Sequence, residues 1–172
     1  VWRVGFLAFR RVAILGSDYN FGPFAQGMRA LGYVEGKNLV IELRSADGKS
    51  EHLPGLAAEL VRLNVDVIVV AGSPATSAAQ KATTTIPIVM GSIGDPVGSG
   101  FIKSLARPGG NITGLSNIAG DLSPKHLEML LSFVPKLSRV AVLVNPTNSS
   151  HSTILKGIQA AAQRASVKIL PV

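Results

Sequence analysis

The chain has 172 residues, 47% of them hydrophobic and 16% charged, so it has ample material for a buried core and does not have the composition of a disordered segment. It contains no cysteine, which excludes disulfides, cysteine-ligated metals and thiol chemistry. The net charge is +7, but apart from Arg3, Arg10 and Arg11 the basic residues are scattered singly without interleaved aromatic residues, so nucleic acid is not a predicted partner.

Short apolar, β-branched runs alternate with longer amphipathic stretches along the chain. The predicted strands cover residues 3–9, 38–44, 66–71, 88–91, 111–115, 139–144 and 167–170. Apolar residues at helical spacing predict helices at 21–31, 53–61, 127–134 and 154–165. Apart from its first residue, Asp66, the run at 66–71 is continuously apolar, as is the run at 140–144, which is typical of parallel strands covered on both faces. The pattern therefore predicts an α/β fold with a doubly wound parallel sheet, like a flavodoxin-like lobe.

A loop-rich segment at 108–120 separates five predicted strands from two strands and two helices. We therefore expect an N-terminal ligand-binding lobe at 1–117 and a partial second lobe at 118–172. An incomplete second sheet would leave an exposed edge near residues 167–172, which invites pairing with another chain. A homo-oligomer formed through that edge is one expected consequence.

Three strand ends share a cap residue followed by proline: Ser73-Pro74, Asp95-Pro96 and Asn145-Pro146. Ser, Asp and Asn are preferred N-caps and Pro is favoured in the first helical turn, so each pair is expected to start a helix above the carboxyl end of a strand. Ligands of open α/β sheets bind at that edge, and the free N–H groups of helix starts attract carboxylates.

Ser73, Thr76 and Asn145 would add neutral donors and acceptors at this edge, and Asp95 a negative charge for an ammonium group. Together they could hold a zwitterion such as an amino acid. A cap followed by proline also occurs at helix starts for structural reasons alone, so a purely structural interpretation stays open at each junction. Tyr19 and Phe21 follow the first strand and either stack on a ligand or staple the next helix.

No catalytic set is complete. The glycines near residues 91–100 do not spell GxGxxG, and the chain contains no GxxxxGK[ST], HExxH or GxSxG. Its three histidines are far apart in sequence, with no second ligand at metal spacing. We therefore predict no catalytic residue, no metal, no cofactor and no enzymatic activity.

Several longer stretches resemble one family. They are LGYVEGKNLVIE at 31–42, DVIVVAGSPA at 66–75, GDPVGSG at 94–100, SLARPGGNITG at 104–114 and RVAVLVNP at 139–146. They resemble the ABC-transporter substrate-binding proteins, a family that includes tryptophan- and tyrosine-binding members. The resemblance implies a type I periplasmic-binding fold of two lobes, with a small solute, expected to be an amino acid, bound between them and hinge closure on the ligand.

The resemblance also implies a periplasmic or extracytoplasmic location, although no leader is visible in this chain, and an ABC permease as the membrane partner. The alternatives are a ligand-binding sensor or regulator effector domain, a truncated fragment that does not bind, and an enzyme on the same fold. Combining the resemblance with the strand ends, the candidate ligand-binding residues are Tyr19, Phe21, Ser73, Pro74, Ala75, Thr76, Asp95, Asn145 and Pro146.

Overall fold

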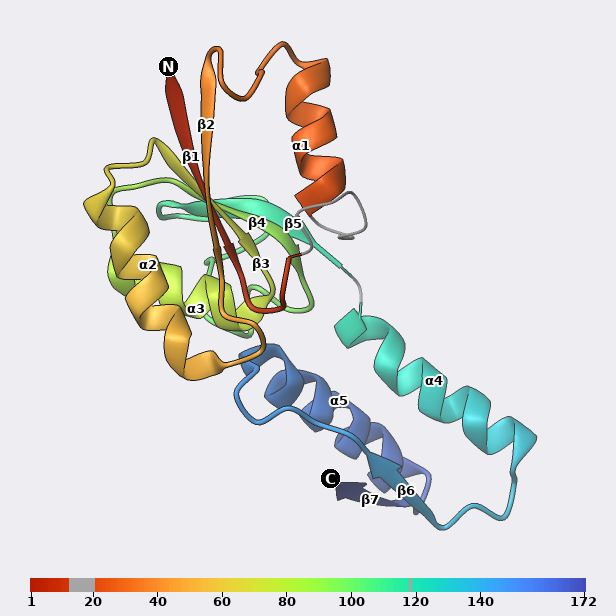
Figure 1. Cartoon of the computed structure of the whole chain (residues 1–172). Helices are drawn as coiled ribbons and strands as arrows, with labels where there is room; N and C mark the ends of the chain where they lie inside the picture. The colour runs from red at the N-terminus through yellow and green to blue at the C-terminus, as the bar shows by residue number, and fades with distance from the viewer. Residues whose placement is uncertain (13–20, 118) are drawn as a thin grey trace.

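The computed structural model describes residues 1–12, 21–117 and 119–172. Its main sheet has five parallel strands, in the order β2-β1-β3-β4-β5 (Figure 1). The strands are β1 (Trp2–Ala8), β2 (Leu39–Ser45), β3 (Val67–Ala71), β4 (Ile88–Ile93) and β5 (Ile112–Ser116). Each lies within about two residues of its predicted range.

Helices cover both faces of this sheet. They are α1 (Phe21–Ala30), the short 3₁₀ helix η1 (Ser50–His52), α2 (Leu53–Arg62) and α3 (Ser73–Ala82). Neighbouring residues of β1 point to opposite faces, so Phe6 packs with Phe21 of α1, whereas Leu7 joins the core formed with Leu60 of α2. The sheet is therefore doubly wound, as the sequence predicts.

A glycine allows the last strand of this sheet to approach its neighbour. Gly114 of β5 has a φ of +138°, and a Cβ atom built there would collide with the backbone oxygen of Met90 in β4. Only glycine adopts this backbone conformation without strain, so the pairing of β5 with β4 depends on it.

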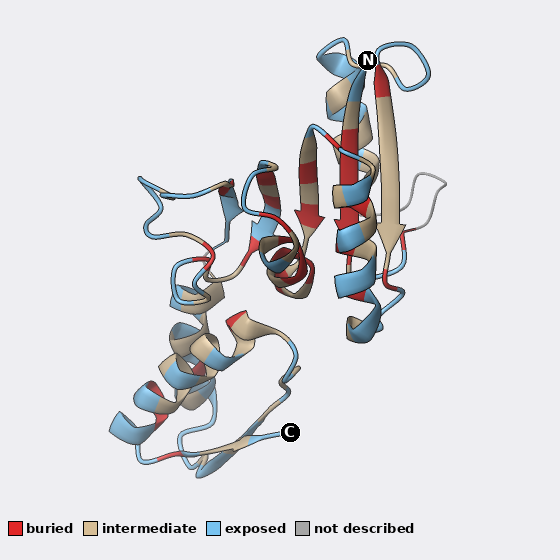
Figure 2. Ribbon diagram, turned by 90° about the vertical axis from the view of Figure 1, so that its left-hand side faces the viewer, coloured by how far each residue is buried: buried red, intermediate tan, exposed pale blue. Residues whose placement is uncertain are grey.

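The C-terminal part forms a separate small layer, drawn below the main sheet in Figure 1. It contains α4 (Ala119–Phe133), β6 (Arg139–Val142), α5 (Ser149–Arg164) and β7 (Lys168–Pro171). β6 and β7 pair in parallel as a two-stranded sheet, and α4 packs along α5. Its core gathers Leu127, Ala161, Ala162 and Val167, and Figure 2 shows far fewer buried residues here than in the main sheet.

One of the three predicted helix starts is confirmed with a shifted cap, and a second helix begins four residues after its predicted start. α3 begins at Ser73, but its N-cap is Gly72, which leaves Ser73 and Pro74 inside the first turn. α5 begins at Ser149, four residues after Asn145, and its N-cap is Asn148, whose side-chain oxygen accepts from the Ser150 amide. Pro at the second helical position is tolerated because its missing N–H has no intrahelical partner there.

The third predicted helix start is wrong. After Asp95-Pro96 the chain makes only a turn, in which the amide of Gly98 donates to Asp95 Oδ1 at 2.8 Å. Gly100, at a φ of +73°, then bends the chain away before a second turn can form. The capping interaction exists, but it closes a turn instead of a helix.

In the described ranges, no helix combines the length and the apolar character needed to cross a membrane.

Candidate functional site

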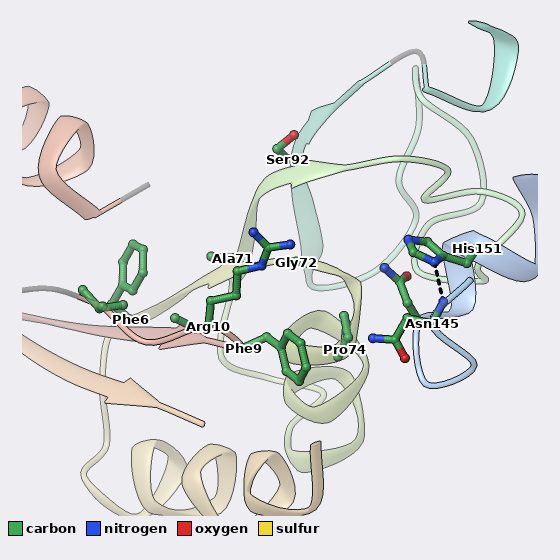
Figure 3. A pocket seen from close by; sticks show the side chains of 12 residues that line it. Phe6, Phe9, Arg10, Ala71, Gly72, Pro74, Ser92, Asn145 and His151 are labelled. Carbon is green, nitrogen blue, oxygen red and sulfur yellow. Dashed lines mark hydrogen bonds between the residues drawn. The ribbon is translucent and has the colours of Figure 1, made fainter. Parts of the chain in front are cut away.

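The main candidate site is a pocket of about 390 Å³ at the carboxyl ends of β1 and β3, facing the start of α5 (Figure 3). Its lining comes from both parts of the chain, namely Phe6, Ala8, Phe9, Arg10, Val12, Ala71, Gly72, Pro74, Ser92, Asn145, Asn148 and His151. Carboxyl ends of parallel strands are where α/β sheets bind ligands, so the position agrees with the edge that the sequence favours.

The lining from the main sheet and α3 includes the apolar side chains of Phe6, Phe9, Val12 and Pro74. Phe6 belongs to β1, and Phe9 is the residue that follows it. The Phe6 ring is fixed by the edge of Phe21, with the ring centroids 5.1 Å apart, so its position depends on α1 packing against the sheet. Phe9 packs against the core that contains Leu7, so the two rings reach the pocket from different faces of the sheet. Apolar lining of this kind favours a solute with an apolar or aromatic group.

The opposite side is polar and comes from the segment before α5 and its first turn. The backbone amide of Asn145 donates to His151 Nδ1 at 3.0 Å, which fixes the imidazole ring (Figure 3). Asn145 Oδ1 accepts from the amide and the hydroxyl of Thr147, at 3.0 and 2.8 Å. These bonds are local to the segment, so it presents its side chains to the pocket in a defined orientation.

A buried contact joins the two parts of the chain beside the pocket. Ser73 Oγ of α3 and Ser150 Oγ of α5 lie 2.7 Å apart, and the two residues are only 4% and 3% exposed. Ser99 Oγ lies 3.3 Å from the same Ser150 hydroxyl. The first turns of α3 and α5 are thereby held against each other, and this contact sets the distance between the two walls of the pocket.

Three predicted residues meet at this pocket or support it. Pro74 and Asn145 line it, and Phe21 supports it through Phe6, which corresponds to the interpretation of Phe21 as a packing residue. Tyr19 lies outside the described residues.

The structure does not bring the other candidates to the pocket lining. Ala75 and Thr76 are fully buried in α3, where the Thr76 hydroxyl donates to the Gly72 carbonyl at 3.0 Å. The Ser73 hydroxyl is hydrogen-bonded to the Ser150 hydroxyl and does not line the pocket. Pro146 is exposed and also lies outside the lining. Successive residues of a helix point in different directions around its axis, so one junction cannot direct Ser73, Ala75 and Thr76 all at a ligand.

Asp95 lies in a second pocket, also of about 390 Å³, between the turn after β4 and the first turns of α4 and α5. Asn117, Asp121 and Thr153 line it as well. The structure therefore separates Asp95 from Asn145, and the expected pairing of the two around one zwitterion is not formed.

Sequence reasoning missed four polar residues of the main pocket: Arg10, Ser92, Asn148 and His151. Arg10 directly follows a strand at the carboxyl edge, which is a usable signal, but it belongs to no motif. His151 gives no signal in sequence, because its role depends on the turn that brings its ring back to the amide of Asn145. No cluster of three or more His, Asp or Glu side chains suited to a metal ion occurs in the described part of the chain.

Comparison with known proteins identifies the family. The family described as ABC transporter substrate binding protein matches residues 16–172. The chain belongs to this family. Its members are substrate-binding proteins and not enzymes.

The most informative relative is a tyrosine-binding protein from Clostridioides difficile, 33% identical over 122 residues, which are 71% of this chain and 35% of the relative. A conserved domain protein from Vibrio cholerae has a TM-score of 0.88 at 29% identity over 99% of this chain. A domain from Streptococcus pneumoniae, solved in complex with L-Trp, has a TM-score of 0.82 at 24% identity, again over 99% of this chain.

The chain spans 35% of the length of the curated tyrosine-binding relative and 56% of the length of each of the two solved structures. Together with a leucine-binding protein from Thermotoga maritima at a TM-score of 0.72, these likenesses confirm the predicted α/β fold of the periplasmic-binding type.

Proposed function

We propose that the protein binds a small solute in the pocket between its two parts and presents it to the permease of an ABC importer. The observation that carries this proposal is the pocket itself, which has one wall at the carboxyl ends of β1 and β3 and the other at the start of α5. Family membership supplies the transport context.

The size and chemistry of the pocket suit a small organic solute. A volume of about 390 Å³ lies at the lower end of the usual range for ligand pockets, roughly 300–1,000 Å³. The apolar lining, which includes Phe6 and Phe9, and the polar wall at Asn145 and His151 would contact the two ends of an amphipathic molecule. Because the curated relative is named as tyrosine-binding and one structural neighbour holds L-Trp, amino-acid-like solutes with a ring are the first class to test.

The cellular setting is inferred from the family. We infer an extracytoplasmic location, with the permease as the membrane partner, since a solute-binding component must meet its solute before the solute crosses the membrane. Binding would be accompanied by closure of one part onto the other around the solute.

A thermal-shift screen of the purified chain against amino acids, small peptides, purines and sugars tests the proposal. A solute at a hundred times its dissociation constant adds about 2.7 kcal/mol, which raises the melting temperature of a domain of this size by roughly 5–10 °C. A selective rise supports solute binding, and no rise with any class contradicts it.

A matched pair of variants locates the binding. Ser92→Trp places a large ring at the pocket, whereas Ser132→Trp makes the same change at an exposed position on α4 outside it. We expect Ser92→Trp to abolish the shift and Ser132→Trp to keep it. Equal shifts in both variants would place the solute elsewhere.

A further inference from the structure

We propose that the pocket recognises the carboxylate of an aromatic acid through Arg10, and that it makes no use of an amino group on the solute. This inference rests on the proposed solute-binding function and names the chemical class of its solute. Its basis is the set of hydrogen-bonding atoms in the polar wall that are already occupied.

The side-chain oxygens of the two asparagines in the polar wall already accept hydrogen bonds from the protein. Asn145 Oδ1 accepts two hydrogen bonds from Thr147, and Asn148 Oδ1 accepts from the amide of Ser150 at 3.1 Å. An amide whose oxygen caps a turn or a helix is left with its NH₂ group as the free half. Both asparagines therefore meet a solute as hydrogen-bond donors.

His151 presents a donor as well. Its Nδ1 accepts from the backbone amide of Asn145, so the neutral imidazole carries its proton on Nε2. The nitrogen that remains for a solute is thus an N–H group.

Arg10 completes the set of donors with a full positive charge. Its guanidinium has no hydrogen bond and no ion pair with any described residue, and Figure 3 shows it extended beside Ala71 and Gly72, towards the space in front of His151. Gly72 and Asn148 are the N-caps of α3 and α5, so the positive ends of two helices lie at the same pocket. A guanidinium with free N–H groups matches the two oxygens of a carboxylate.

Among the residues that the structure describes at the pocket, an ammonium group has no comparable partner. No Asp or Glu belongs to the described lining, and Asp95 accepts from Gly98 and faces the second pocket. Because both asparagine oxygens already accept hydrogen bonds, the side chains of the polar wall favour a carboxylate over an ammonium. The apolar part of the lining, which includes Phe6 and Phe9, would then contact the ring of the solute.

Three ligands that share one ring test this by isothermal titration calorimetry: hydroxyphenylpropionate, L-tyrosine and tyramine. The first lacks the amino group and the third lacks the carboxylate. We expect hydroxyphenylpropionate to bind at least as tightly as L-tyrosine, and tyramine to bind at least tenfold more weakly than either. Tyramine binding as tightly as the acid, L-tyrosine binding tenfold more tightly than the acid, or no binding of all three would overturn the proposal.

Neighbouring arginines provide a matched pair of variants. Both arginines are exposed, but only Arg10 lines the pocket. Arg10→Gln should weaken hydroxyphenylpropionate by about 10- to 100-fold, the usual effect of losing a charge-assisted hydrogen bond, with Arg11→Gln within about twofold of the parent. Equal affinities in the two variants would refute the role of Arg10.

Failure of this inference and failure of solute binding give different results. If the screen finds a solute that has no carboxylate, the pocket binds solutes but the carboxylate inference is wrong. If no solute of any class binds, both proposals fail. Should Arg10→Gln not fold, the ligand series on the parent protein still decides between acid and amine.

Discussion

The hydrogen bond between Ser73 and Ser150 can be tested by a double-mutant cycle, and it bears directly on how the two parts of the chain pack. The two hydroxyls lie 2.7 Å apart and both residues are nearly buried, so the bond should contribute about 1 kcal/mol net. Ser73→Ala should cost about 1 kcal/mol, because Ser150 keeps Ser99 at 3.3 Å as a second partner. Ser150→Ala should cost about 1–2 kcal/mol, since it leaves Ser73 without that partner.

The assay is urea denaturation of the parent, both single variants and the double variant. We expect a coupling energy of about 1 kcal/mol, well above the roughly 0.3–0.5 kcal/mol within which independent sites add. Ser50 and Thr147 serve as a control, because their hydroxyls also bridge the two parts, at 3.1 Å, but on the exposed surface. Ser50→Ala should change stability by no more than about 0.5 kcal/mol. Purely additive effects of Ser73→Ala and Ser150→Ala would show that the two parts do not dock as the structure has them.

Three further predictions concern the fold. Leu60→Ala, at a fully buried position, should lower the free energy of unfolding measured in urea by about 2–5 kcal/mol. Leu143→Ala, at an 86% exposed position, should change this free energy by no more than about 0.5 kcal/mol, and equal losses in the two variants would contradict the assigned core. Gly114→Ala should cost at least about 2 kcal/mol, because its φ is positive and its Cβ would strike Met90, while Gly110→Ala, with open space around it, should cost less than about 1 kcal/mol. The unpaired edges of the β6–β7 sheet predict association, so light scattering should give a mass that rises with concentration above the 17.9 kDa of one chain, and a constant monomer mass would contradict this.

The strands were predictable from sequence because their signal is local. A buried parallel strand needs a short, continuously apolar run, and the run at 66–71 can hardly form anything else between its two helical neighbours. The positions of strand ends also indicated the correct edge of the sheet for the pocket. The structure formed after a strand end was less predictable, because a polar residue followed by proline lies in the first turn of a helix at Ser73 but closes a single turn at Asp95.

The composition of the site was less predictable because it depends on contacts between distant segments. Ser73 meets Ser150 across 77 positions of sequence, and nothing near either residue indicates that the pair exists. Arg10 reaches the pocket because the register of β1 with β3 sets Ala8 opposite Ala71, which puts the residue two positions later beside Gly72. The residues at each strand end therefore indicate the correct edge of the sheet, but they do not indicate which distant residues they will contact there.

The most direct test of solute binding between the two parts is an NMR titration of the ¹⁵N-labelled protein with hydroxyphenylpropionate. We expect amide shift changes that gather at Gly72, Asn145 and Asn148, on the two walls of the main pocket. Changes confined to Asn117 and Asp121 in the second pocket, or no changes at saturating concentration, would contradict solute binding at this site.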